Sequence, residues 1–281
     1  MASETRTRAR TGSYGRAVAT YVRKHAFAPR YRPEQALSLV AADGVRLSGA
    51  RLDGPPSAFA SVVLVHGLMH SSRTPRIHAF AHWLARDVNV LVPELRGHGR
   101  SEGACSFCKD EPRDVEAAVQ GASAAWPGVP VVTVGASLGG AAALLHAGMY
   151  GGVAGVVAVS APAEWRPDEA AATRRVYRYA TTRAGRTFVT YAFRTRLGDR
   201  CDGVPGSRHL VAAIAPAFTL VVHDPADHYF GRDHPEAVYE WAREPKGLWW
   251  EHGAGHGTDL LTADFAGRLL AELRRRLAAT A

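Results

Sequence analysis

The stretch PVVTVGASLGG at residues 130–140 places a serine between glycines, directly after a β-branched run. Within it, residues 135–139 have the G-x-S-x-G spacing of a nucleophile elbow, a sharp strand-to-helix turn that exposes a serine hydroxyl. The run at 130–134 is typical of a buried strand, and the Ala/Leu-rich segment 138–149 favours a helix. This order of strand, turn and helix is the context that the motif requires, so Ser137 is the candidate nucleophile.

The segments on either side of this turn alternate between short apolar runs and helix-forming stretches. The apolar runs predict strands at 61–65, 88–92, 129–134, 153–159, 218–222 and 247–250, and helices are expected at 75–86, 110–125, 138–149, 235–243 and 258–278. A hairpin around Asp43-Gly44 is expected before them, with strands near 37–41 and 45–52. Continuous apolar strands that alternate with helices predict an α/β fold, with a mostly parallel sheet and helices on both faces.

One long segment, residues 162–212, interrupts the alternation. It is rich in arginine and aromatic residues and has helix-forming stretches near 168–181 and 184–194. Segments of this length between regular elements usually carry function. We therefore interpret residues 36–281 as a single domain with a helical cap insertion at about 162–212.

The net charge of +8 is concentrated in residues 1–32, which hold eight Arg or Lys and one Glu. Residues 1–35 are therefore interpreted as a basic N-terminal extension, and no basic face for nucleic acid is expected on the domain. Tyr14, Val18 and Tyr21 recur at helical spacing among the arginines. Such a stripe is compatible with a solvated tail, with packing onto the domain, or with weak contact with an anionic membrane surface.

The composition also restricts the compartment and the cofactors. No apolar run approaches 18 residues and the N-terminus lacks the apolar core of a signal peptide, so a cytoplasmic protein is expected. Cys105 and Cys108 form a C-x-x-C pair, and Cys201 stands far from them in the sequence. The pair indicates incidental thiols or, alternatively, a disulfide or redox latch. The histidines lack the spacing of a metal motif, so we expect no metal and no cofactor.

A serine hydroxyl needs a base within hydrogen-bond reach, and that base needs a carboxylate to orient it. His256 is the candidate base, because it lies in a glycine-rich loop between an expected strand and the last expected helix. Asp227 is the candidate acid, because it lies on the loop after the expected strand at 218–222. His252 and Asp224 are the alternatives, but each stands closer to its strand, where a packed side chain or a tight turn is usual.

Acyl transfer also needs hydrogen-bond donors at the point where negative charge develops on the substrate oxygen. The N–H of Leu138, directly after the serine, is the first candidate donor. The loop after the first expected parallel strand is the second source, and it offers the N–H groups of Leu68 and Met69. His66 and Gly67 open this loop and are expected to line the substrate site.

Four landmarks in this order resemble the α/β-hydrolase superfamily: His66-Gly67, the stretch ELRGHGRS at 94–101, the turn around Ser137, and the pair Asp227 and His256. The resemblance covers about residues 37–280. The second landmark is similar to the D-x-R-G-x-G-x-S loop of the esterase, lysophospholipase and serine-aminopeptidase-like branch, with Glu94 in place of the usual Asp. Ala136 and Asp224 are further departures from the pattern of that branch.

The resemblance implies a Ser–His–Asp triad, an acyl-enzyme intermediate and no metal. A serine nucleophile argues against the epoxide hydrolase and haloalkane dehalogenase branches, which use an aspartate. The leading interpretation is a serine hydrolase that acts on a carboxylic ester or thioester of a small-molecule acyl substrate. A peptidase or a C–C bond hydrolase with the same triad is an alternative, and so is a non-catalytic binding module with this fold.

Residues 162–212 are expected to set the substrate. Trp165 and Tyr177 offer apolar contacts to an acyl group, and ten arginines lie between Arg166 and Arg208. In one interpretation the aromatic side chains pack the cap onto the domain and the arginines face water. In the other, they form an acyl pocket rimmed by positive charge, which suits an acid-bearing or phosphorylated substrate.

Overall fold

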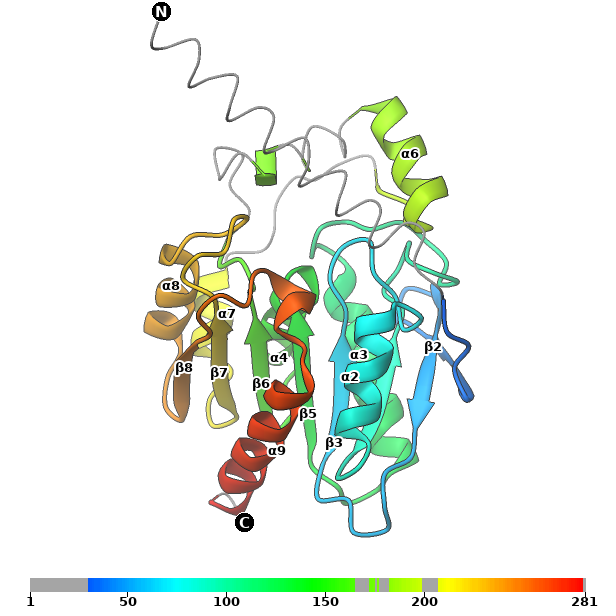
Figure 1. Ribbon diagram of the computed structural model, residues 1–281. Coiled ribbons are helices and arrows are strands. Elements are labelled where there is room, and N and C mark those ends of the chain that lie inside the picture. The colour runs from blue at the N-terminus through cyan, green and yellow to red at the C-terminus, as the bar shows by residue number, and fades with distance from the viewer. Residues whose placement is uncertain (1–29, 165–171, 175, 177–181, 199–206, 280–281) are drawn as a thin grey trace, which may run out of the picture.

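An eight-stranded sheet lies at the centre of the computed structural model, which describes residues 30–164, 172–174, 176, 182–198 and 207–279. In spatial order the strands are β1 (Gln35–Val40), β2 (Arg46–Leu52), β4 (Asn89–Pro93), β3 (Ser61–Val65), β5 (Val131–Ala136), β6 (Gly155–Val159), β7 (Phe218–His223) and β8 (Lys246–Trp250). β2 is antiparallel to both β1 and β4, whereas the neighbours from β4 to β8 are parallel. The parallel strands therefore end at one common edge of the sheet (Figure 1).

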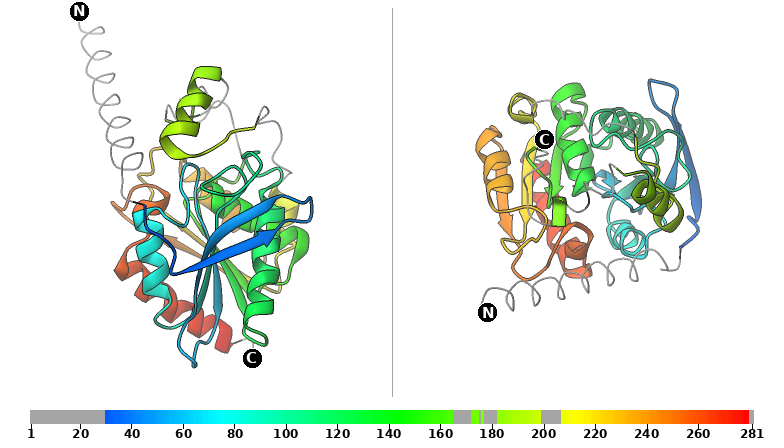
Figure 2. Two further views of the ribbon diagram at one scale, coloured as in Figure 1. Left: turned by 90° about the vertical axis from the view of Figure 1, so that its right-hand side faces the viewer. Right: turned by 90° about the horizontal axis from the view of Figure 1, so that it is seen from above.

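Helices cover both faces of the sheet (Figures 1 and 2). One face is covered by α2 (Pro75–Leu84) and α9 (Ala263–Ala278), and the other by α3 (Glu111–Ala125), α4 (Leu138–Tyr150), α7 (Ser207–Ala212) and α8 (Asp233–Trp241). A further helix, α6 (Arg183–Phe193), stands above the edge where the parallel strands end (Figure 1). No helix in the described parts of the chain is long and apolar enough to cross a membrane.

The alternation of side chains along each strand explains the two layers of the core. In β3, Val62 and Leu64 pack against α2 and α9, whereas Val63 and Val65 pack against α3 and α4. All four side chains are fully buried. A strand with helices on both sides has no solvent-facing positions, which is why the inner parallel strands β3 to β7 are buried along their whole length.

The expected hairpin is present between β1 and β2. Leu39 pairs with Leu47 and Val40 pairs with Arg46, and Gly44 in the connection has a φ of 84°. This is the left-handed region that glycine adopts without steric cost. The expected strands of the sheet and the helices of its two layers are likewise present, with ends that differ by a few residues.

The last expected helix, 258–278, is wrong at its start. Residues Gly257–Leu260 form a short 3-10 helix, and α9 begins only at Ala263. The reason is the N-cap, because the Thr262 hydroxyl accepts a hydrogen bond from the N–H of Phe265 at 3.1 Å. This bond satisfies one of the N–H groups that have no partner inside the helix and fixes where α9 starts.

The helix expected at 184–194 is present as α6. The segment that follows it is bound to the loop after β4 through two isolated β-bridges, His98 with Thr195 and Cys105 with Leu197. The main chain of the insertion is therefore fixed to the ELRGHGRS loop.

Other parts of the insertion and of the N-terminus lie outside the described residues. These include residues 1–29 and most of the helix expected at 168–181. At the far end of the insertion, α7 packs against α4 and α8 and buries Ser207 and Val211. This short helix thus adds to the helical layer on that face of the sheet.

Candidate active site

Ser137 stands at the sharp turn between β5 and α4. Its backbone φ is 53° and its ψ is −119°, a conformation that residues with a Cβ rarely adopt. A Cβ on Gly135 would lie 2.3 Å from the carbonyl oxygen of Gly139, and a Cβ on Gly139 would lie 2.3 Å from the carbonyl oxygen of Val65. A Cβ at either position would overlap with backbone atoms, which is why glycine stands on both sides of the serine, as the G-x-S-x-G pattern predicts.

Two side chains from loops after later strands meet at Ser137. His256 Nε2 lies 3.0 Å from Ser137 Oγ, and His256 Nδ1 lies 2.6 Å from Asp227 Oδ2. An ionised carboxylate can only accept, so Nδ1 carries the ring proton and Nε2 accepts from the serine hydroxyl. His252, the alternative base, is exposed. The structure thus brings the three residues selected from the sequence into one chain of hydrogen bonds.

The carboxyl group of Asp227 is fully buried and is kept ionised by its hydrogen bonds. Burial acts to raise its pKa, but the His256 side chain and the N–H of Tyr229 outweigh burial and hold the pKa below its ordinary value. Its Oδ1 accepts the N–H of Tyr229 at 2.8 Å and the N–H of Phe230 at 3.3 Å. The backbone therefore fixes one oxygen while the other faces His256.

A second histidine, His223 at the end of β7, also lies close to the carboxylate of Asp227. Its Nε2 donates to the carbonyl oxygen of Phe230 at 3.1 Å and stands 3.9 Å from Asp227 Oδ2. Burial lowers the pKa of His223, so the ring stays neutral. It supports the turn that carries the acid and does not compete with His256 for the carboxylate.

Asp224, the alternative acid, binds the backbone of both loops. Its Oδ1 accepts the N–H of Ala226 at 2.9 Å and its Oδ2 accepts the N–H of Gly255 at 2.7 Å. Its carbonyl oxygen accepts the N–H of Asp227 at 2.9 Å. Because Gly255 directly precedes His256, this residue connects the turn of the acid to the loop of the base. The sequence comparison with the superfamily predicts a glycine here, so this role was missed.

The turn after β3 lies directly against the serine. A Cβ on Gly67 would lie 3.4 Å from Ser137 Cβ, which is ordinary contact distance. The carbonyl oxygen of Gly67 accepts the N–H of His70 at 3.2 Å and closes the turn, with Met69 at a φ of 63° inside it. The expected position of Gly67 beside the nucleophile agrees with this geometry.

The three candidate oxyanion donors, the N–H groups of Leu138, Leu68 and Met69, have no acceptor among the residues that the structure describes. Leu138 is the first residue of α4, so its N–H has no partner inside the helix. The N–H groups of Leu68 and Met69 also donate to no residue that the structure describes. The partial positive charge at the start of α4 favours an anion next to Ser137. That these groups hold an oxyanion stays a prediction.

The imidazole of His66 has no nitrogen left for a substrate, which corrects the sequence-based expectation. The residue is fully buried, its Nδ1 lies 2.8 Å from the carbonyl oxygen of Gly67, and its Nε2 accepts the N–H of Leu95 at 3.1 Å. Burial lowers its pKa and keeps it neutral. His66 connects the turn beside Ser137 to the loop after β4.

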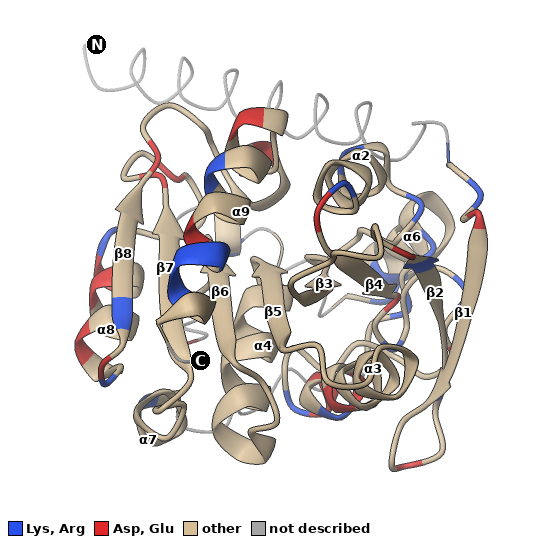
Figure 3. Ribbon diagram, turned by 90° about the horizontal axis from the view of Figure 1, so that it is seen from below, with Lys and Arg blue, Asp and Glu red and all other residues tan. Residues whose placement is uncertain are grey.

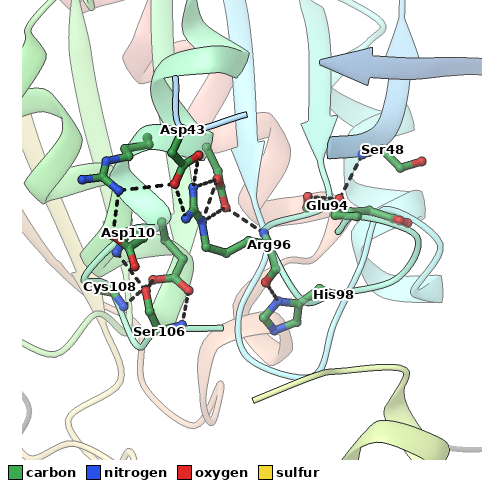
Figure 4. Close-up of polar contacts among 12 residues, drawn as sticks. Asp43, Ser48, Glu94, Arg96, His98, Ser106, Cys108 and Asp110 are labelled. Atoms are coloured by element: carbon green, nitrogen blue, oxygen red, sulfur yellow. Dashed lines mark hydrogen bonds and ion pairs between the residues drawn. The ribbon is translucent and has the colours of Figure 1, made fainter. Parts of the chain in front are cut away.

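The stretch ELRGHGRS after β4 forms a buried polar framework (Figure 4). The guanidinium group of Arg96 donates to Asp114 Oδ1 at 2.7 Å and to Asp43 Oδ2 at 2.8 Å. A Cβ on Gly99 would lie 2.3 Å from Glu94 Oε2, so the carboxylate occupies the space beside this glycine. This landmark of the superfamily therefore stabilises the loop and does not reach Ser137.

Cys105 and Cys108 are free thiols, and both are buried. The alternative of a disulfide between them is therefore not the state of this structure. Cys108 Sγ donates to the carbonyl oxygen of Leu138 at 3.4 Å. The C-x-x-C loop thus contacts the first turn of α4.

The expected substrate contacts of Trp165 and Tyr177 lie outside the described residues, as does Cys201. Among the residues that are described, no group of three or more His, Cys, Asp or Glu side chains could hold a metal ion. The chemistry of the site is therefore argued from its own side chains.

Comparison with known families now gives the class of protein. The family model described as "Serine aminopeptidase, S33" matches residues 56–225, more than half of the chain. The chain belongs to this family and has the α/β-hydrolase fold. The matched range includes Ser137 and ends before Asp227 and His256.

Two relatives with a similar sequence are named as uncharacterized proteins. The uncharacterized protein YfhR of Salmonella typhimurium is 26% identical over 237 residues, which cover 78% of this chain and 73% of that protein. YfhR of Escherichia coli is 27% identical over 233 residues, covering 76% and 70% of the two chains.

Solved structures with the same fold include two esterases. An esterase of Pyrococcus furiosus superposes with a TM-score of 0.68 at 20% identity, covering 86% of this chain and 90% of that one. The esterase RhEst1 of a Rhodococcus species also gives 0.68, at 19% identity and with coverage of 86% and 98%. At these identities the likeness shows the fold.

Proposed function

We propose that the chain is a serine hydrolase that cleaves a carboxylic ester or thioester bond of a small acyl substrate. The observation that carries the proposal is the chain of hydrogen bonds from Ser137 Oγ to His256 Nε2, at 3.0 Å, and from His256 Nδ1 to Asp227 Oδ2, at 2.6 Å. A base at this distance activates a hydroxyl that is otherwise a weak nucleophile. The esterase activity named for two proteins of the same fold supports the choice of bond.

The residues divide the reaction between them. Ser137 Oγ attacks the substrate carbonyl carbon while His256 Nε2 takes the hydroxyl proton, and the N–H groups of Leu138 and Leu68 or Met69 bind the oxygen that becomes negative. The imidazolium then gives its proton to the leaving oxygen or sulfur. The acyl group remains on Ser137 until a water, deprotonated by His256, attacks the ester and releases the acid.

Asp227 contributes by orientation and charge. Its hydrogen bond to Nδ1 holds His256 in the tautomer whose Nε2 can accept a proton. Its buried negative charge stabilises the imidazolium that forms after proton transfer. The hydrogen bonds to Tyr229 and Phe230 keep the carboxylate in the required position.

A peptidase is the second candidate, because the family description names a serine aminopeptidase. An aminopeptidase substrate carries an ammonium group, which needs an acidic partner when it leaves water. Glu94, the acid after β4, is fully buried and its oxygens accept bonds from the Ser72 hydroxyl and the Arg100 N–H. This commitment of Glu94 favours ester or thioester cleavage over removal of a charged N-terminal residue.

Labelling with a fluorophosphonate probe tests the nucleophile. The wild-type chain is expected to be labelled and to hydrolyse aryl esters, and Ser137→Ala is expected to lose labelling and at least about 10⁴-fold in kcat. Ser57→Ala, at an exposed loop serine, is the matched control and should keep both. An unlabelled wild-type chain would support the binding-module alternative.

A substrate panel then tests the bond. We expect turnover of aryl esters or acyl thioesters and little turnover of aminoacyl anilides, measured as kcat/KM at equal concentrations. Turnover of the anilides alone, lost in Ser137→Ala, would replace the esterase proposal with the peptidase.

A further inference from the structure

Five arginine side chains come together beside the loop after β4, and we call them the arginine cluster: Arg30, Arg32, Arg73, Arg100 and Arg194. They come from four parts of the chain, namely the residues before β1, the turn after β3, the loop after β4 and the end of α6. Main-chain bonds join these parts in two pairs. The N–H of Tyr31 donates to the carbonyl oxygen of Arg73 at 3.2 Å, and the N–H of Gly99 donates to that of Arg194 at 3.0 Å.

The positive charge of the arginine cluster has little compensation within the described residues. Arg73 Nε lies 3.6 Å from Glu94 Oε1, and this carboxylate also accepts the main-chain N–H of Arg100 at 2.7 Å. Arg32, Arg100 and Arg194 form no ion pair with any residue that the structure describes. The carboxylate of Glu94 therefore compensates part of the charge of Arg73 and Arg30.

The arginines of the cluster also act on one another. Burial, together with the charges of Arg100, Arg194 and Arg32, lowers the pKa of Arg73. Burial and the charge of Arg194 lower the pKa of Arg30. Because guanidinium groups remain charged at neutral pH, this proximity is repulsive and an anion bound between them would relieve it.

Several arginines elsewhere on the surface are paired with carboxylates. Arg268 donates to both oxygens of Glu251, at 2.7 and 2.8 Å, and Arg275 lies 2.6 Å from Glu272. Acidic and basic residues are interspersed along α9 (Figure 3). Exposed Arg86 and Arg243 have no ion pair among the described residues either, so the arginine cluster is distinguished by guanidinium groups that lie close enough to repel one another.

The arginine cluster lies within substrate reach of the nucleophile. Glu94 directly follows β4, and only β3 separates β4 from β5, which carries Ser137 at its end. Neighbouring strands are about 4.8 Å apart, so the end of β4 lies roughly 10 Å from the end of β5. A charged group held there would be several bonds away from the carbonyl carbon that the serine attacks.

We propose that the arginine cluster binds an anionic oxygen group, a carboxylate or a phosphate, of the substrate whose acyl bond Ser137 attacks. The proposal rests on the proposed function and names its substrate class. Guanidinium groups match planar carboxylates and phosphates because they donate two parallel hydrogen bonds. The anion occupies the space between Arg73, Arg100 and Arg194, and the ester or thioester carbonyl reaches the turn after β5.

Two matched substrate pairs test the cluster and separate the two sources of the anion. For the carboxylate, p-nitrophenyl monoesters of dicarboxylic acids from succinic to sebacic acid are compared with their methyl-capped neutral analogues. For the phosphate, S-acetyl phosphopantetheine is compared with S-acetyl pantetheine. In one pair or the other we expect kcat/KM to be at least about tenfold higher for the anionic member at low ionic strength.

Variants of the arginine cluster should remove this preference. In the double variant Arg100→Gln/Arg194→Gln, the ratio of anionic to neutral kcat/KM is expected to fall at least about fivefold, mainly through KM of the anionic substrate. Sodium chloride at 0.5 M should reduce the wild-type ratio in the same way. Arg194→Lys should retain part of the preference, and Arg86→Gln, at an exposed arginine on the opposite edge of the sheet, should retain all of it.

A binding measurement keeps this test independent of turnover. The Ser137→Ala chain is titrated with suberate and with inorganic pyrophosphate, and one of the two is expected to raise its thermal midpoint. When Arg100→Gln and Arg194→Gln are added to the same chain, neither probe should raise the midpoint. The proposal is overturned if neither probe raises the midpoint, or if the substrate preference is absent or survives the double variant. Absent turnover of all substrates, with the probe still bound, would instead reject the hydrolase function.

Discussion

At the scale of single residues, Asp224 shows how one side chain can position the residues of the proposed triad. Its two carboxylate oxygens and its carbonyl oxygen accept three N–H groups, from Ala226, Gly255 and Asp227. Burial acts to raise its pKa, but the N–H donors outweigh burial and lower it, so the group is an anion in the folded chain. The carboxylate and the carbonyl oxygen of this one residue therefore connect the turn of the acid to the loop of the base.

Removal of this carboxylate should reduce catalysis more than stability. In Asp224→Ala the loop with Gly255 loses its anchor and His256 can move away from Asp227, and misplacement of about 1 Å costs roughly 100-fold in rate. We expect kcat on an aryl ester to fall about 10- to 100-fold with a smaller change in KM, measured by steady-state kinetics. Asp224→Asn keeps an acceptor and should fall between this variant and the wild type.

The matched control is Asp87→Ala, which removes a surface carboxylate 3.4 Å from Arg274. It should leave kcat within about twofold, because exposed ion pairs contribute little. A kcat for Asp224→Ala as close to wild type as that of the control would show that the two loops keep their positions without this carboxylate.

At the scale of elements, the contact between β3 and α4 fixes the serine turn. Gly139 is the second residue of α4, and a Cβ there would lie 2.3 Å from the carbonyl oxygen of Val65 and 2.5 Å from that of His66. Both atoms belong to the backbone and cannot rotate away. The helix therefore approaches the end of β3 as closely as main chains allow, and this approach sets the position of Ser137.

Gly139→Ala should consequently destabilise the protein although alanine favours helices. Overpacking costs about 1 to 3 kcal/mol or more, whereas the helix propensity of alanine returns about 1 kcal/mol. We expect a net loss near 2 kcal/mol, seen as a thermal midpoint lower by roughly 5 °C in calorimetry.

Gly267→Ala is the control, and it is expected to raise stability where Gly139→Ala lowers it. Gly267 lies in α9, where a Cβ would meet nothing within 4 Å, so the substitution should add about 0.5 to 1 kcal/mol to the free energy of unfolding. A midpoint for Gly139→Ala at or above that of wild type would mean that α4 can shift away from β3 without cost.

The elements most visible in the sequence are those with a local physical cause. The continuous apolar run at 61–65 predicts β3, the glycines around Ser137 predict the turn, and the order of residues predicts Asp227 and His256 as its partners. Each follows from burial on two faces, from steric space or from catalytic need. These features are properties of one segment and its neighbours.

The features that were not predicted depend on contacts between distant segments. The buried role of His66 requires the N–H of Leu95, and the role of Asp224 requires that of Gly255, 31 residues away. The arginine cluster joins four parts of the chain that no spacing rule connects. The start of α9 is the exception, because the capping signal of Thr262 was present in the sequence and overlooked.

At the scale of the whole molecule, two features concern charge: the arginines gathered near the N-terminus and the histidines that are neutral because they are buried. Residues 1–32 hold most of the net charge of +8, and Arg30 and Arg32 from this stretch join the arginine cluster. The contact of the preceding basic residues with an anionic membrane stays a prediction. The second feature makes stability depend on pH, because several buried histidines are neutral in the folded chain.

The buried pair His66 and His98 should make the protein sensitive to acid. The two rings lie 5.0 Å apart between centroids, and burial, with the charges of His66 and Arg196, lowers the pKa of His98 to about 3. In the unfolded chain the His98 side chain takes up a proton as the pH falls below about 6.5, whereas in the folded chain it stays neutral at that pH. The stability due to this neutral ring is therefore complete above about pH 6.5 and is lost as the pH falls toward 3, by about 1.4 kcal/mol per pH unit.

The substitution His98→Asn removes this titration and can keep the hydrogen bond that Nδ1 makes with the carbonyl oxygen of Arg96 at 3.0 Å. Between pH 7.5 and pH 5 we expect the variant to lose about 2 kcal/mol less unfolding free energy than the wild type, measured by urea denaturation. His209→Asn, at an exposed position on α7, should leave the pH dependence unchanged. Equal slopes for His98→Asn and wild type would show that His98 accepts a proton in the folded state, which requires water to reach the loop after β4.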